Sequence, residues 1–170
     1  MYRWSKIRDK LENEYLADSL KGHIRYFATA YRESHDGDKG RAAIYLDGKP
    51  VVSGSSYEQF ERAGFRRSSD YPGLEDSDLK NGWFDQYDFY LSFQEYDNQS
   101  IEASLNSQNQ LVRVFALLDR RVGKRALCRM KESIETEPEI FRLFYAIRMG
   151  AEGLAAEYPI QCAGLMYSNG

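Results

Sequence analysis

Cysteine is scarce in this sequence, and long apolar runs are missing. The 170 residues include two cysteines, Cys128 and Cys162, and neither has a cysteine or histidine nearby at the spacing of a zinc site. Two cysteines are also too few for a disulfide-stabilised scaffold, so we expect both to be reduced thiols. No apolar run approaches the ~18 residues needed to cross a membrane, and none follows the N-terminal residues as in a secretory signal. We therefore expect a soluble, cytoplasmic protein without membrane contact.

Histidine is equally rare, which narrows the catalytic possibilities. The chain has only His23 and His35, and nucleophilic hydrolysis usually needs a histidine as general base beside a serine or cysteine. His35 stands next to Asp36 in a turn, but adjacent residues seldom orient one another as a catalytic pair. His23 stands at the start of a predicted strand. We expect both to be structural histidines, and if the protein is an enzyme they and Asp36 are its candidate catalytic residues.

Motifs for cofactors and metals are absent as well. There is no Walker loop, no dinucleotide fingerprint, no nucleophile elbow and no His-Glu-x-x-His helix. Asp36 and Asp38 start like a calcium-binding loop, but Lys39 and Gly40 stand where the third acidic ligand belongs. We therefore expect no metal ion and no cofactor.

The charge that is present is unevenly spread. The chain has 26 acidic and 23 basic residues, for a net charge of −3. Residues 35–110 carry 14 acidic and seven basic residues, whereas residues 111–170 carry nine basic and seven acidic ones. A dedicated nucleic-acid-binding protein is usually more basic, so the charge balance favours a protein partner over a nucleic acid. We infer instead that the acidic middle complements the basic parts of the fold or meets a partner protein.

The first third of the chain has the spacing of one helix followed by a three-stranded antiparallel sheet. Four residues recur at helical intervals and should pack on the sheet: Trp4, Ile7, Leu11 and Tyr15. Alternation then predicts strands over residues 23–33 and 41–47 and a shorter one at 51–52, with a tight turn at Asp47-Gly48. Residues 23–33 are apolar on both faces, so we expect that strand to be central or covered on both sides.

A helix and a long acidic loop should follow the sheet. Ser56 begins a capping-box pattern, which predicts a short helix ending near Gly64. Residues 65–82 are rich in Ser, Asp, Gly and Pro and lack periodicity, so we expect a weakly ordered loop. Residues 84–96 fit either a strand or a helix.

The rest of the chain is predicted to be helical. Capping-box patterns begin at Ser107 and Thr136, each followed by an apolar stripe, and residues 127–134 have the spacing of a further amphipathic helix. Together these elements predict a single domain of the α+β class. In it the helix, sheet and short helix of residues 1–64 precede four to five helices over residues 83–158.

Three segments resemble a family of small cytoplasmic bacterial proteins of uncharacterised function. They are Arg-Trp-Ser-Lys-Ile-Arg at residues 3–8, Tyr-Arg-Glu-Ser-His-Asp-Gly at 31–37, and Leu-Asp-Arg-Arg-Val-Gly-Lys-Arg at 118–125. The resemblance extends over residues 2–150 and favours a helix over 84–96. It implies a bacterial origin but no activity, cofactor or catalytic residue.

The most distinctive local sequence is the basic elbow, residues 119–125. Its four basic residues are the candidate binding residues: Arg120, Arg121, Lys124 and Arg125. We expect Gly123 to end one helix and admit the next, which would put the first two bases in a last helical turn and the other two at a helix start. Two interpretations are open. The bases pair with Asp119 or with acidic residues of the 85–102 stretch, or they converge on a phosphate or an acidic partner surface.

Three functions from different classes follow from these patterns. The first is a non-enzymatic binding protein, adaptor- or immunity-like, that meets a partner protein through its acidic middle. The alternative is a small hydrolase or transferase that uses His23 or His35 with a nearby carboxylate. The third is nucleic-acid or anion binding through the basic cluster at residues 120–131.

Overall fold

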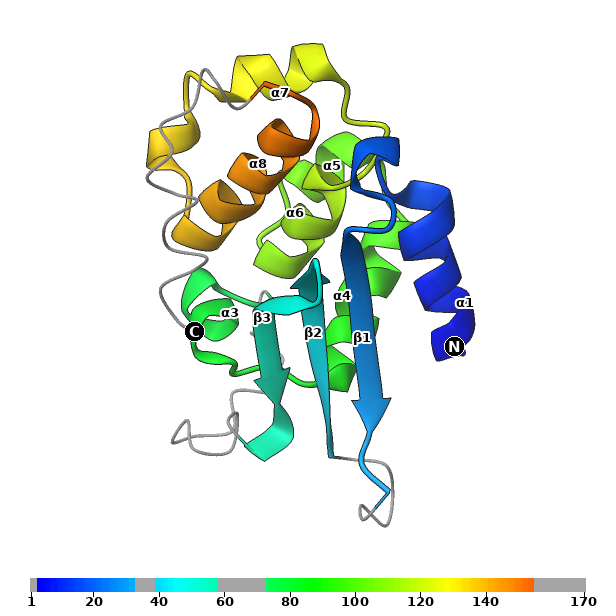
Figure 1. Ribbon diagram of the computed structural model, residues 1–170. Helices are drawn as coiled ribbons and strands as arrows, with labels where there is room; N and C mark the ends of the chain where they lie inside the picture. Colours follow the sequence, from blue (N-terminus) through cyan, green and yellow to red (C-terminus); the bar gives the residue numbers. More distant parts are fainter. Residues whose placement is uncertain (1–2, 33–38, 58–72, 155–170) are drawn as a thin grey trace.

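The computed structural model describes residues 3–32, 39–57 and 73–154, and it has the predicted α+β class. In chain order the elements are α1 (Trp4–Asp9), a π-helical segment (Lys10–Tyr15), a 3-10 turn (Asp18–Leu20), β1 (Ile24–Ala30), β2 (Gly40–Leu46), β3 (Lys49–Ser55), α3 (Asp76–Asn81), α4 (Gln86–Asp97), α5 (Ile101–Leu105), α6 (Gln110–Leu117), α7 (Lys124–Met130), a second 3-10 turn (Ile134–Thr136) and α8 (Glu139–Ala151). The strands form one antiparallel sheet with α4 behind it, and α8 packs on α6 (Figure 1). Among the described residues no helix is long and apolar enough to cross a membrane.

The sheet has the order β1-β2-β3, and one face of β1 includes exposed Arg25, so the prediction that this strand is central or covered on both sides was wrong. β2 is the central strand, and β1 is an edge strand that alternates between buried and more exposed residues. Glu12 covers part of this edge, because its carboxylate accepts a hydrogen bond from the Tyr26 backbone N–H at 2.9 Å. One face of β1 is buried in the core, and the other, outer face includes the ring of Phe27. This arrangement explains why both faces of the strand have apolar residues.

The turn between β2 and β3 is as predicted, but β3 is longer than expected. Asp47 and Gly48 have φ values of 49° and 81°, the left-handed pair that a two-residue hairpin turn requires. β3 has seven residues rather than two, because its pairing with β2 continues through polar Ser53 and Ser55. Pro50 lies on an edge strand, where a missing N–H is tolerated.

The N-terminal helical segment packs beside β1 and against α4. Ile7 and Leu11 are buried as predicted. Trp4 is only half-buried, and the edge of its ring meets Phe89 of α4 with centroids 5.7 Å apart. The stripe thus lies between the sheet edge and α4.

The segment 84–96 forms a helix, α4, from Gln86 onward, as the resemblance favours, and it brings an aromatic core to the inner face of the sheet. Phe89 of α4 and Phe115 of α6 meet edge-on with centroids 5.2 Å apart, and both contact the Tyr26 ring. Six of the eight residues of α6 are buried, so it is the central helix that its apolar sequence predicts.

The prediction of an acidic loop over residues 65–82 was wrong for residues 73–82, which the structure describes. Residues 65–72 lie outside the described part, as does the predicted helix beyond Tyr57. Leu74 is buried, and residues 76–81 form α3, in which Asp78 and Leu79 are buried. The acidic residues here cap a helix, which a search for apolar periodicity does not detect.

Helix starts also differ from the predicted capping boxes. The N-cap of α6 is Asn109, not Ser107, and its side chain accepts from the backbone N–H groups of Leu111 and Val112. The N-cap of α8 is Pro138, not Thr136, and it offers no side-chain cap. The predicted helix at 127–134 ends at Met130.

Candidate functional site

The basic elbow, residues 119–125, comprises most of the connection between α6 and α7 together with the first two residues of α7. α6 ends at Leu117, before the bases, and Gly123 is the extended N-cap of α7 rather than the end of α6. The Asp119 side chain accepts from the Arg121 backbone N–H at 2.7 Å, which holds a turn in place of the predicted last helical turn. Arg120 and Arg121 therefore lie in a turn, and only Lys124 and Arg125 begin a helix.

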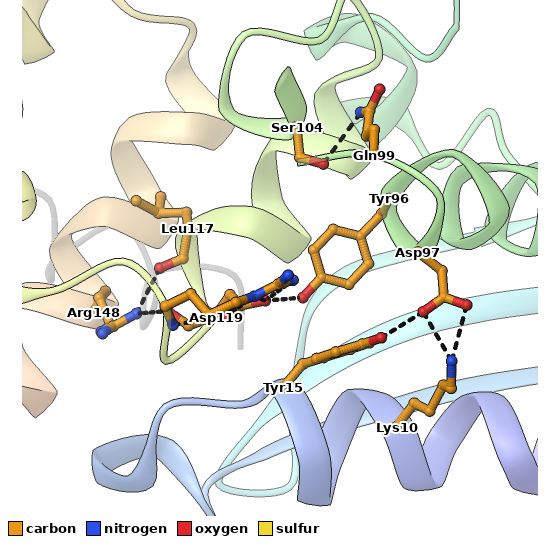
Figure 2. Close-up of polar contacts among 10 residues, drawn as sticks. Lys10, Tyr15, Tyr96, Asp97, Gln99, Ser104, Leu117, Asp119 and Arg148 are labelled. Atoms are coloured by element: carbon orange, nitrogen blue, oxygen red, sulfur yellow. Dashed lines mark hydrogen bonds and ion pairs between the residues drawn. The ribbon is translucent and has the colours of Figure 1, made fainter. Parts of the chain in front are cut away.

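Asp119 is the centre of a buried polar joint, defined here as Asp119 with Tyr15, Tyr96, Arg121 and Arg148. Figure 2 shows Asp119 between Tyr96 and Arg148. Its carboxylate, 1% exposed, accepts hydrogen bonds from the Tyr96 hydroxyl and from Arg121 Nε and Nη2, the last at 2.7 Å. These bonds to Asp119 raise the pKa of Arg121 above its ordinary value. Burial, reinforced by the Asp119 charge, raises the pKa of Tyr96. The carboxylate is thus fully engaged within the protein.

Arg148 on α8 completes the joint, and its role was not predicted from the sequence. Its guanidinium, 3% exposed, donates to the carbonyls of Leu117, Asp119 and Val122 at 2.7–2.9 Å. Its Nε donates to Glu152 at 2.9 Å. The position of Arg148 in the sequence could have indicated this role. It lies four residues after Phe144, so its charge falls on the apolar stripe of α8.

The N-terminal segment is tied to the same place. The Tyr15 hydroxyl donates to Asp97 at 2.6 Å, and Lys10 Nζ contacts the same carboxylate at 3.0 Å (Figure 2). The Arg121 guanidinium lies 5.0 Å from the Tyr15 ring centroid. For Arg121 the packing interpretation is therefore confirmed. Three other bases of the elbow, Arg120, Lys124 and Arg125, are exposed, and no ion pair is recorded for them within the described residues.

Of the predicted catalytic residues, His23 alone lies within the described ranges. His23 Nδ1 lies 2.7 Å from Asp47 Oδ1 beside the hairpin turn, and both side chains are more than half exposed. An exposed pair of this kind at a turn is typical of a surface contact. His35 and Asp36 lie outside the described residues. Across the described ranges, no group of three or more His, Cys, Asp or Glu side chains is arranged to hold a metal ion.

The acidic middle is largely used to hold the fold together. Asp78 and Asp88 accept from the N-cap backbone N–H groups of their helices at 2.9 and 3.0 Å. Asp76 accepts from the Ile140 backbone N–H at the start of α8, and Asp97 holds Lys10 and Tyr15. These acids therefore offer little free charge to a partner.

The sheet differs from the acidic middle, because every charged residue on its strands is basic. In Figure 1 the strands stand in front of α4, and no described helix crosses their near face. The residues of β1, β2 and β3 include no Asp or Glu. Arg41 reaches along this face, with its guanidinium 5.0 Å from the Phe27 ring centroid and its Nη2 donating to the Tyr45 hydroxyl at 2.6 Å. Ala43 lies between Arg41 and Tyr45 on β2 and is fully buried, so the Arg41 side chain passes over it.

Two tyrosines and a lysine extend this face past the end of β1. The Tyr31 and Tyr57 rings stack with centroids 5.6 Å apart and 22° between their planes. Lys39 Nζ lies 5.9 Å from the Tyr57 centroid, and Tyr57 is 55% exposed. We call the set Phe27, Tyr31, Arg41 and Tyr57 the outer aromatic face. Sequence analysis missed it because its members come from two strands and two segments after strands.

The fold and these surfaces define a small α+β protein with a buried polar joint and an aromatic, acid-free sheet face. The chain belongs to the SF0329 protein family, whose model matches residues 3–149. This match agrees in extent with the resemblance over residues 2–150. Comparison with curated proteins and with solved structures gave no match.

Proposed function

We propose that the protein is a non-enzymatic binding protein that holds an anionic partner against the outer face of its sheet. The observation that carries this proposal is the absence of acidic residues from all three strands in a chain of net charge −3. Arg41 and Lys39 are placed over aromatic rings on that face. A local positive surface on an acidic protein attracts a negatively charged partner.

The use of the remaining polar groups supports binding over catalysis. Asp119 and Arg148 are consumed by the joint, and Asp78 and Asp88 by helix caps. His23 is paired with Asp47 at an exposed turn. Bacterial origin, a cytoplasmic location and interaction with a partner protein stay predictions from the sequence.

A second candidate surface is the exposed part of the basic elbow. Arg120, Lys124, Arg125 and Arg129 are exposed on one short stretch. Asp119, the acidic residue that immediately precedes that stretch, is buried and bonded to Arg121. Anion binding by these four bases is therefore the alternative that the experiment must separate.

Retention on a heparin resin separates the two surfaces. A protein of net charge −3 is repelled by a polyanion unless it has a concentrated positive surface, so we expect retention at low salt for the wild type. Arg41→Glu should elute at clearly lower salt, because it reverses charge at the centre of the sheet face. Arg125→Glu is the matched control, with the same charge change on the elbow.

The outcomes are distinct. Retention lost in Arg41→Glu and kept in Arg125→Glu supports the sheet face, provided that both variants keep the wild-type circular dichroism and melting temperature. The reverse pattern assigns the binding to the elbow. If the wild type is not retained, the proposal is overturned.

A further inference from the structure

We infer that the anionic partner is a single-stranded nucleic acid, whose bases stack on the outer aromatic face while its phosphates meet the cations around it. This inference rests on the proposed function and specifies its ligand. The face combines two properties that single strands need, positive side chains and an exposed aromatic ring, Tyr57.

The charges around the face suit a phosphate backbone. The Arg41 guanidinium lies over the Phe27 ring, and Lys39 lies over the Tyr57 ring. Because no strand residue is acidic, a backbone that follows the sheet meets no carboxylate on the strands. Arg25, also on the outer face, is paired with Glu12 at 3.0 Å, so its charge is partly neutralised. We therefore assign the phosphate contacts to Arg41 and Lys39.

The rings provide stacking surfaces at two separate points. Tyr57 is exposed, and its stack with Tyr31 holds the ring in a defined orientation. At the other point the Arg41 guanidinium lies over Phe27. Bases stack on arginine planes as well as on aromatic rings, so this pair presents a second stacking surface. The hydrogen bond from Arg41 to Tyr45 keeps the guanidinium near the sheet.

The same geometry favours a single strand over a duplex or an acidic peptide. In a duplex the base faces are stacked on each other and cannot reach Tyr57 or the Arg41–Phe27 pair. An acidic peptide would use the cations but would gain little from ring faces. β1 has seven residues, which gives the face a length of about 23 Å at ~3.3 Å per residue. That length matches a short segment of a single strand rather than an extended groove.

Fluorescence anisotropy with labelled oligonucleotides tests the inference. The probes are a 12-nucleotide oligouridine RNA, a 12-nucleotide oligothymidine DNA and a 12-base-pair DNA duplex. We expect both single strands to bind more tightly than the duplex. With two phosphate contacts, the affinity should fall with a slope of roughly −1.4 in a plot of log affinity against log salt concentration. A difference between the RNA and the DNA identifies which of the two is the preferred ligand.

The stacking step is tested by variants that change the ring and not the charge. Tyr57→Leu should weaken single-strand binding by about tenfold, since base–aromatic stacking contributes ~1–3 kcal/mol and 1.4 kcal/mol is tenfold. Tyr57→Phe keeps the ring and should bind like the wild type. Leu91→Ala is the control for loss of an exposed apolar side chain elsewhere, because Leu91 is 61% exposed on α4. Because Tyr57 is exposed, we expect these variants to fold normally.

Each result decides for or against the inference. Preference for the single strands together with loss in Tyr57→Leu and retention in Tyr57→Phe supports it. Equal binding of duplex and single strands, or wild-type affinity in Tyr57→Leu, overturns it. Retention on heparin with no oligonucleotide binding also overturns it, while leaving the proposed binding of an anionic partner intact and pointing to an acidic protein.

Discussion

Asp119 shows how one buried carboxylate organises its surroundings at the scale of a single residue. Its side chain accepts from the Tyr96 hydroxyl, from the Arg121 side chain and from the Arg121 backbone N–H, while its own backbone carbonyl accepts from Arg148. Burying a charge is costly unless hydrogen bonds and an opposite charge compensate it. Here both forms of compensation are present, so removing the carboxylate leaves several hydrogen-bond donors without an acceptor.

We predict that Asp119→Ala destabilises the protein by about 3 kcal/mol. The Tyr96 hydroxyl would lose its acceptor inside the protein, and each unsatisfied buried group costs ~1–3 kcal/mol. Urea unfolding followed by circular dichroism measures the loss. Arg121→Ala should cost a comparable amount, because it leaves the buried Asp119 carboxylate without its opposite charge. An Asp119→Ala midpoint equal to that of the wild type would contradict this account.

At the scale of elements, some helix ends are capped by residues from other elements. Pro138 precedes α8 without a side-chain cap, and the backbone N–H of Ile140 in the first turn instead donates to Asp76 of α3 at 2.8 Å. Lys80 of α3 also meets Glu139 of α8 at 2.5 Å. A carboxylate at a helix N-terminus is favoured by the helix dipole as well as by the hydrogen bond. α3 and α8 therefore depend on each other.

We predict that Asp76→Ala lowers the free energy of unfolding by about 1 kcal/mol, the usual cost of losing an N-terminal cap. Lys80→Ala is the matched comparison on the same pair of helices. It should change stability by less than Asp76→Ala does, because the Lys80–Glu139 pair is exposed. Chemical unfolding of both variants under the same conditions checks the difference, and equal losses would refute the capping role of Asp76.

This difference between local and distant partners explains which elements could be predicted from the sequence. The Asp47-Gly48 turn and the α6 stripe depend on residues close in the chain, and both were predicted correctly. The start of α8 and the packing of α3 depend on Asp76 and on buried Leu79, whose partners are distant. At the candidate site, pairing of the elbow's bases with Asp119 was one of the two interpretations left open by the sequence. The outer aromatic face was not predicted, because strand register sets Arg41 opposite Thr29 and so diagonal to Phe27.

At the scale of the whole molecule, buried tyrosines link stability to alkaline pH. The Tyr26 hydroxyl lies in the core near Asp119 and Glu12, and burial first, then these two charges, raise its pKa well above 10. Burial and Asp119 act on Tyr96 in the same direction. In the unfolded chain a tyrosine ionises near pH 10. Above that pH the folded state retains protons that the unfolded state loses, so stability falls as pH rises.

We predict that Tyr26→Phe removes one part of this alkaline loss. Between pH 9 and pH 11 the wild type should lose about 1.4 kcal/mol more stability than the variant, one proton's worth over the unit above pH 10. Urea unfolding at the two pH values gives the comparison, with pH 7 as the reference at which this contribution vanishes. Parallel losses in both proteins would show that Tyr26 does not carry the effect.

Some contacts of the N-terminal segment can form only late in the synthesis of the chain, because the partner residues are made late. The Ala17 backbone N–H donates to the Leu118 carbonyl, and Ser19 donates to Glu152, 133 residues later. A ribosome adding ~5–20 residues per second needs roughly 5–20 s to pass from residue 17 to residue 118. For that interval buried Leu16 and Leu20 have been made but their partners have not. The nascent segment therefore spends seconds with apolar side chains uncovered, in the period when chaperones act.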